Sequence, residues 1–196
     1  MKKLYHGAEA IIYKKNNSIL KDRIPKKYRH PELDKKIRKL RTRHEARIIE
    51  KASKIIPSPK IISSDESNSK IEMSFINGKR LSDNLEKLSH KEICKKIGKN
   101  LAKLHDDEII HGDLTTSNLI LSGEKVFFID FGLSYHSPRT EDKAVDLHLI
   151  KEALTAKHPK IAEQSFKEIL KGYKTSKNYK KTLAQLEKVE KRGRYT

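Results

Sequence analysis

Apolar and polar positions follow two different periods along the chain. Short β-type runs dominate the first third, and turn residues such as Asn16 and Asn17 separate them. These strand-like runs are residues 4–15, 16–24, 60–63 and 70–76. Between them, after a basic linker PKKYRHP, apolar side chains recur at helical spacing from Glu32 to Ile56. The apolar positions of this predicted helix are Leu33, Ile37, Leu40, Ile48, Ala52 and Ile55.

Beyond Asn77-Gly78 the pattern becomes mainly helical. Ser89, followed three residues later by Glu92, forms a capping-box pattern that predicts the start of a helix. After this helix come two short predicted strands, a turn at Gly123 between them, and three more helices, the second ending at Gly172. The strands are 118–122 and 126–130, and the helices are 141–157, 159–171 and 176–191. Strands followed by helices predict an α+β fold.

Composition limits the classes of protein. Hydrophobic residues make up 35% and charged residues 36%, so the core is lean. Lys and Arg number 44 against 26 Asp and Glu, and the net charge of +18 favours polyanionic partners such as nucleic acid. A Lys-rich surface that only increases solubility is the alternative. The single Cys94 excludes an internal disulfide, and no apolar run suits a membrane span or signal peptide. We therefore expect a cytoplasmic protein that does not span a membrane, and we expect no zinc site.

Two carboxylates stand at the ends of apolar runs in IIHGDLTTSNLILSGEKVFFIDFG. Such residues are costly unless they are hydrogen-bonded, paired or bound to a metal. Asp113 and Asn118 match the kinase pattern H-R-D-x-x-x-x-N, with Gly112 in the Arg position, and Asp130 opens D-F-G. Asp113 would orient the attacking hydroxyl or water or accept its proton, while Asn118 and Asp130 would ligate Mg²⁺. Turn formation and helix capping are the alternative.

A kinase-like site also needs a strand Lys for the nucleotide phosphates and a helix Glu that holds it. Lys21, in ILKDRI, is the best candidate, because its rivals Lys14 and Lys15 border the turn. Helical phase places Glu45 near the apolar stripe and Glu50 on the opposite side, so Glu45 can face Lys21. A surface ion pair within the helix is the alternative role of Glu45.

Together these residues resemble the protein-kinase-like superfamily, and in detail the minimal PRPK-type atypical kinase/ATPase of the KEOPS (EKC) complex. The resemblance rests on YHGAEAIIY, ILKDR, RTRHEARIIEKA, HGDLTTSN and IDFGLSYHSPRTEDKAVDL. It implies one bilobal domain that uses ATP and Mg²⁺: a small β-rich N-lobe with one long helix at 1–76, a mainly helical C-lobe at 77–190 and a basic tail at 191–196. A RIO-like protein kinase, a family that normally carries an additional N-terminal domain, is the nearest alternative.

The resemblance also assigns further nucleotide-binding residues. Gly7, Ala8 and Glu9 take the place of the glycine-rich loop, although the loop keeps only one glycine. Met73 would guard the adenine pocket, and the segment after it would offer backbone groups to the base from Phe75 and Ile76. In the following helix, Asp146 resembles the buried Asp that braces the catalytic loop of kinases.

Departures from ordinary protein kinases narrow the expected activity. The chain reaches a helix soon after Gly132 without an A-P-E element, and no Arg precedes Asp113. ATP hydrolysis or autophosphorylation by an atypical serine/threonine kinase therefore fits better than broad protein phosphorylation. In the resembled family, this activity supports threonylcarbamoyladenosine formation on tRNA, with a transferase subunit and a small regulatory subunit as partners. A tRNA-binding or regulatory module with incidental catalysis is the alternative function.

The positive charge suggests where such partners bind. Contacts with tRNA or with a partner protein are predicted for residues of the long helix and of the tail. These residues are Arg41, Arg43, Lys191, Arg192 and Arg194. For each one alone, a solvated surface charge remains the alternative.

Overall fold

A computed structural model describes residues 1–192, which form two compact units. Unit 1 comprises Met1–Ser53 and Ser58–Ile76, and unit 2 comprises Lys54–Pro57 and the residues from Asn77 onward. The fold is α+β as predicted, with an antiparallel β-rich first part and a helical second part. Among residues 1–192, no helix is both long and apolar enough to cross a membrane.

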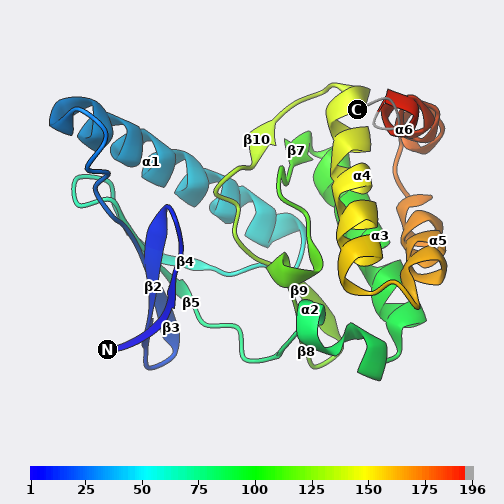
Figure 1. The fold of residues 1–196 in the computed structure, drawn as a ribbon, viewed down its shortest axis with the longest axis horizontal. Helices are drawn as coiled ribbons and strands as arrows, with labels where there is room; N and C mark the ends of the chain where they lie inside the picture. Colours follow the sequence, from blue (N-terminus) through cyan, green and yellow to red (C-terminus); the bar gives the residue numbers. More distant parts are fainter. Residues whose placement is uncertain (193–196) are drawn as a thin grey trace. The chain divides into compact units, whose positions relative to one another are not determined.

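Unit 1 is built on an antiparallel sheet of five strands in the order β1-β2-β3-β5-β4 (Figure 1). The strands are β1 (Lys2–His6), β2 (Ala10–Lys15), β3 (Ser18–Arg23), β4 (Ile61–Asp65) and β5 (Lys70–Ser74). The predicted run 4–15 is therefore a hairpin that turns at Gly7–Glu9, not one strand. The turn predicted at Asn16 and Asn17 is confirmed, and Asn16 adopts the left-handed conformation (φ +50°) that such a tight hairpin requires.

The long helix of unit 1 is α1 (Pro31–Ile55), and its buried face is partly polar. Leu33 and Leu40, predicted to lie on an apolar stripe, are 52% and 50% exposed, so this part of the prediction is wrong. The buried positions of α1 are Asp34, Thr42, Glu45, Ala46, Ile48, Ile49 and Ala52. The apolar pattern thus describes the second half of α1, whereas ion pairs and hydrogen bonds replace apolar contacts in the first half.

Unit 2 contains the remaining helices, two small sheets and two 3₁₀ turns. The helices are α2 (Leu81–Asn84), α3 (His90–Asp106), α4 (Thr140–Lys157), α5 (Ala162–Tyr173) and α6 (Tyr179–Arg192). One sheet pairs β6 (Lys79–Arg80), β8 (Leu119–Ser122) and β9 (Lys125–Phe128), and the other pairs β7 (Ile109–Ile110) with β10 (Tyr135–His136). The 3₁₀ turns are η1 (Leu85–Lys87) and η2 (Thr116–Asn118). Fully buried Leu101, Leu104, Phe128, Phe131 and Leu147 join these elements into one core.

Glycines let α3 and α5 approach each other closely in this core (Figure 1). A Cβ atom on Gly98 would collide with the Ile169 carbonyl, and one on Gly172 with the Lys95 carbonyl. The prediction that Gly172 ends its helix is therefore wrong, because α5 continues to Tyr173 and uses Gly172 for contact. Ser89 does precede α3, but its side chain makes no capping bond, so the predicted capping box does not form.

Candidate active-site residues

In unit 1, Lys21 of β3 and Glu45 of α1 form a buried ion pair. The Lys21 Nζ atom lies 2.7 Å from Glu45 Oε1, and the Glu45 side chain is only 1% exposed. The second oxygen, Oε2, accepts a hydrogen bond of 2.5 Å from the guanidinium of Arg23, which is also buried. Glu45 therefore pairs with two cations of the same strand, and the prediction that it faces Lys21 is confirmed.

Arg23 was not predicted from the sequence, although its spacing from Lys21 gave a signal. Residues two apart on a strand point to the same face, so Arg23 shares its face with Lys21. The rival lysines have other contacts: Lys14 lies 3.9 Å above the Phe75 ring, and Lys15 pairs with Glu72 at 3.5 Å. Glu50 is exposed, as expected from its helical phase.

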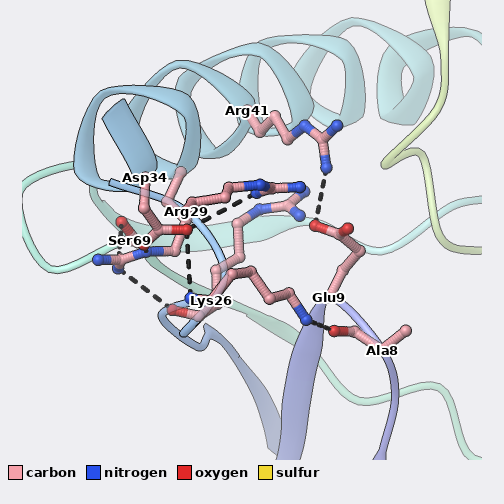
Figure 2. Close-up of polar contacts among 9 residues, drawn as sticks. Ala8, Glu9, Lys26, Arg29, Asp34, Arg41 and Ser69 are labelled. Atoms are coloured by element: carbon pink, nitrogen blue, oxygen red, sulfur yellow. Dashed lines mark hydrogen bonds and ion pairs between the residues drawn. The ribbon is translucent and has the colours of Figure 1, made fainter. Parts of the chain in front are cut away.

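The predicted phosphate-covering loop, Gly7–Glu9, connects β1 to β2. The Gly7 N–H donates to the Ala10 carbonyl at 3.0 Å and closes the turn. The other two loop residues are bound from outside the hairpin: Lys26 donates to the Ala8 carbonyl, and Arg41 pairs with Glu9 at 2.7 Å (Figure 2). This loop is thus attached to the linker that precedes α1 and to α1 itself.

The predicted adenine-binding segment follows β5. Met73 is buried and pairs with Ile19 of β3, while Phe75 and Ile76 are half-buried. The Phe75 N–H already donates to the Asn17 carbonyl at 2.9 Å. The strand pattern of this segment could be predicted from the sequence, but the hydrogen bond from the Phe75 N–H to the Asn17 carbonyl could not. The backbone group that Phe75 can offer a base is therefore its carbonyl.

In unit 2, Asp146 of α4 holds the loop at His111 and Gly112 by its backbone. Its carboxylate accepts hydrogen bonds from the N–H groups of His111 (2.6 Å) and Gly112 (2.8 Å), which confirms the predicted bracing role. Gly112 has a φ of +78°, and a Cβ there would collide with the Leu133 carbonyl. The kinase arginine is replaced by glycine because the backbone conformation at this position excludes a side chain.

Asp113, Asn118 and Asp130 lie on adjoining segments of unit 2. The Asn118 side-chain amide donates to the Asp113 carbonyl at 2.9 Å and to its carboxylate Oδ2 at 3.0 Å. The Asn118 carbonyl accepts from the Ile129 N–H at 3.0 Å, so Asn118 lies opposite the residue before Asp130. Asp130 has a φ of +61°, a strained conformation that is concentrated at functional sites in proteins.

These donor atoms fit a magnesium ion. Because both hydrogen bonds use the Asn118 amide nitrogen, its oxygen remains as a neutral ligand, and Asp130 supplies an exposed carboxylate. Mg²⁺ prefers oxygen ligands and usually takes only one or two of them from protein side chains, while water and phosphate supply the rest. Within residues 1–192, no cluster of three or more His, Cys, Asp or Glu could hold a metal by itself.

Two further buried residues, His105 and Tyr173, support Asp146 and were missed by sequence analysis. Nε2 of His105 lies 3.2 Å from the Asp146 carboxylate, and its Nδ1 lies 2.8 Å from the Tyr173 hydroxyl. Burial raises the pKa of Tyr173 to about 12, so its hydroxyl stays protonated and can donate. A polar pair at core positions of α3 and α5 was the available signal, but only the tertiary packing shows that His105 lies between Tyr173 and Asp146.

The buried histidine of the catalytic loop itself is neutral. Burial lowers the pKa of His111, whose ring lies between Phe128 and Phe131. Its Nδ1 accepts from the Asp113 N–H at 3.4 Å, and its Nε2 lies 3.2 Å from the Ile129 carbonyl. A neutral ring with its proton on Nε2 satisfies both contacts and connects the Asp113 segment with the Asp130 segment.

The predicted anion-binding residues are mostly paired within the chain. Arg41 pairs with Glu9, and Arg43 donates two hydrogen bonds to Glu66, at 2.8 and 2.6 Å. Lys191 and Arg192 lie exposed in the last turn of α6, where Arg192 pairs with Glu141 at 2.7 Å. Arg194 lies outside the described residues.

A different set of cations has no such partners. The exposed lysines Lys91, Lys95, Lys99 and Lys103 recur every four residues along α3. None of them has a hydrogen bond or ion pair with the part of the chain that the structure describes. We call these four residues the α3 lysine row.

Comparison with known proteins identifies the family. The model of the RIO domain matches residues 3–147. KEOPS complex subunit Bud32 of Pyrococcus abyssi is 42% identical over all of this chain and 96% of its own length. The chain belongs to the Bud32 family. In Dictyostelium discoideum, the EKC/KEOPS complex subunit bud32 is 41% identical, and the match covers 96% of this chain and 81% of that protein.

Longer relatives and a solved structure complete the comparison. A probable bifunctional tRNA threonylcarbamoyladenosine biosynthesis protein of Methanobrevibacter smithii is 42% identical over 97% of this chain, which spans only 36% of that protein. The crystal structure of WbdD shares the fold, with a TM-score of 0.59 at 15% identity over 88% of this chain and 45% of WbdD. Family and fold together make this chain a kinase/ATPase-type protein.

Proposed function

We propose that this chain is the Mg–ATP-dependent kinase/ATPase subunit of a KEOPS complex and supports threonylcarbamoyladenosine formation on tRNA. The observation that carries the proposal is the hydrogen bond between Asn118 and the Asp113 carboxylate, on a loop that Asp146 holds rigid. The names of the relatives support the complex, since two name KEOPS and one names tRNA threonylcarbamoyladenosine biosynthesis. The expected partners are a transferase subunit, a small regulatory subunit and tRNA.

The chemistry follows from the protonation and orientation of these side chains. Asn118 donates to Oδ2 of Asp113, and Oδ1 has no partner among residues 1–192. Oδ1 can therefore accept the hydrogen of a water molecule or hydroxyl group and direct its oxygen for attack. Bound Mg²⁺ would neutralise phosphate charge next to Asn118 and Asp130. Lys21, held by Glu45, is the cation available to the nucleotide phosphates in unit 1.

The phosphoryl acceptor is water or a hydroxyl of the chain itself. Helix α4 begins at Thr140, soon after Asp130-Phe131-Gly132, and the intervening residues include the short strand β10. This segment leaves little chain for docking a peptide substrate. Hydrolysis of ATP and autophosphorylation as an atypical serine/threonine kinase are therefore favoured over phosphorylation of many proteins.

The test is ATP turnover of Asp113→Asn, measured first for the chain alone and then with the transferase subunit and tRNA. A positioned base contributes about 10²- to 10⁴-fold, so turnover should fall at least about 100-fold while nucleotide binding persists. Asp107→Asn, an exposed acid just after α3, is the matched control and should retain full turnover. Normal ATP turnover and tRNA modification by Asp113→Asn would exclude the enzymatic proposal.

A second function, docking of RNA, is favoured by the α3 lysine row. Lysines that lack carboxylate partners can neutralise phosphates without first losing an internal ion pair. A pure docking module would bind tRNA normally and support its modification with Asp113→Asn. The two functions are compatible in one chain, and this variant separates them.

A further inference from the structure

An acidic residue in the β1–β2 loop raises an electrostatic question. Under the proposed function, this loop covers the phosphates of ATP, and Glu9 is one of its three residues. A carboxylate next to a triphosphate is repelled, because like charges in a partly desolvated site interact strongly. A loop with this sequence therefore needs a cation that neutralises Glu9 and keeps its side chain in a defined place.

Arg41 supplies that cation from α1. Its Nη1 atom lies 2.7 Å from Glu9 Oε2, with the two side chains 42% and 46% exposed. Figure 2 shows the Glu9 carboxylate directed toward Arg41 and the α1 helix. On the other side of the same loop, the Lys26 ammonium group donates to the Ala8 carbonyl. Two successive loop residues are thus held by two cations.

The linker that carries Lys26 is itself fixed to α1. The Lys26 N–H donates to Asp34 Oδ1 at 3.2 Å, and Arg38 donates to Asp34 Oδ2 at 2.7 Å. The hydrogen bond from Arg38 is the main cause that lowers the pKa of Asp34, so this carboxylate stays ionised to a lower pH than an ordinary Asp. Arg29 adds a second cation 3.7 Å from the Asp34 carboxylate. The ammonium group that binds Ala8 therefore belongs to an ordered segment.

We propose that Arg41 is a positioning residue for nucleotide binding, which neutralises Glu9 and holds it against α1 so that the loop tolerates the phosphates of ATP. This inference rests on the proposed function. It assigns Arg41 a role inside the chain, in place of the direct contact with nucleic acid expected from sequence. An RNA phosphate at Arg41 would have to compete with Glu9.

The test compares four proteins with the wild type: Arg41→Gln, Glu9→Gln, the double variant and Arg47→Gln. Exposed ion pairs are worth little, so Arg41→Gln should raise the KM for ATP by about two- to fivefold with kcat unchanged. Adding Glu9→Gln removes the repelled carboxylate and should return KM toward the wild-type value. Arg47→Gln removes the same charge from an exposed position of α1 and is the control that should keep the wild-type KM.

Each outcome of this comparison supports or overturns the role of Arg41. Suppression of the Arg41→Gln defect by Glu9→Gln supports the pair, and the defect should shrink between about 0.05 M and 1 M salt because screening weakens exposed charges. An increase in KM that Glu9→Gln does not suppress means that Arg41 acts directly, and an unchanged KM for Arg41→Gln also overturns the inference. If the wild-type chain itself binds no ATP, the proposed function fails instead.

Discussion

At the scale of single residues, Glu45 has an unusual environment because two cations share its carboxylate. Lys21 and Arg23 occupy its two oxygens, with side-chain exposures of 11% and 4%. Taking three charges out of water is costly, and the cost is offset only while all of them are paired. The arrangement therefore links the stability of unit 1 to the position of the proposed phosphate-binding lysine.

Glu45→Gln should accordingly affect stability as well as nucleotide binding. The substitution keeps the shape but leaves two buried cations without a countercharge, which costs about 3–5 kcal/mol. Hydrogen exchange of β3 and α1 amides should show this loss of protection, and the KM for ATP should rise. Glu50→Gln, on the exposed face of the same helix, should change neither quantity. Equal protection in the two variants would mean that the ion pairs are energetically unimportant.

Side-chain periodicity explains which of these residues could be predicted. Lys21 was identifiable because it lies within a strand whereas its rivals border the turn, and Glu45 because helical phase places it on the inner face. Phase did not reveal that Arg23 shares the same carboxylate, or that His105 connects Tyr173 to Asp146, because those contacts join residues from different elements. Motif spacing located Asp113, Asn118 and Asp130, and their chemical roles remain predictions.

At the scale of elements, strand and helix types could be predicted well, whereas their contacts could not. The first half of α1 buries Asp34 and exposes leucines. Asp34 is paired with Arg38 of the same helix and with the linker that precedes α1, and these polar contacts override the apolar pattern. Gly172 is a residue type that often ends helices, but here it lies within α5 at the contact with α3. The sequence does not distinguish a glycine that ends a helix from one that allows two helices to pack closely. Only the backbone of α3 facing Gly172 shows which role it has.

Gly172→Ala tests this interpretation through the sign of its effect. Helix propensity alone predicts that alanine stabilises an interior helix position by about 1 kcal/mol. The clash with the Lys95 carbonyl predicts the opposite, a destabilisation of about 1–3 kcal/mol or more as α3 and α5 are forced apart. Denaturant unfolding of the chain measures the difference. Lys167→Ala, on the exposed face of α5, is the control and should be nearly neutral; a stabilised Gly172→Ala would show that the helices separate at no cost.

At the scale of the whole molecule, the net charge is +18, but some of the basic residues form internal ion pairs and others do not. Three α1 arginines already have internal partners: Arg38 pairs with Asp34, Arg41 with Glu9 and Arg43 with Glu66. The α3 lysine row, in contrast, places four exposed cations without a described hydrogen bond or ion pair at a regular spacing along one helix. With a rise of about 1.5 Å per residue, these lysines are spaced about 6 Å apart along the helix.

Replacing all four residues of the α3 lysine row by Gln should weaken the binding of a tRNA transcript and change its salt dependence. Each lost phosphate contact lowers the slope of log K against log salt by about 0.7–0.9, so the slope should become shallower by about 3. A control with the same charge change replaces other exposed lysines that lack described partners, namely Lys157, Lys160, Lys180 and Lys181. If only net charge matters, both variants will lose the same slope. If the α3 lysine row binds RNA, only the first variant will lose it, and ATP turnover without RNA should stay normal in both.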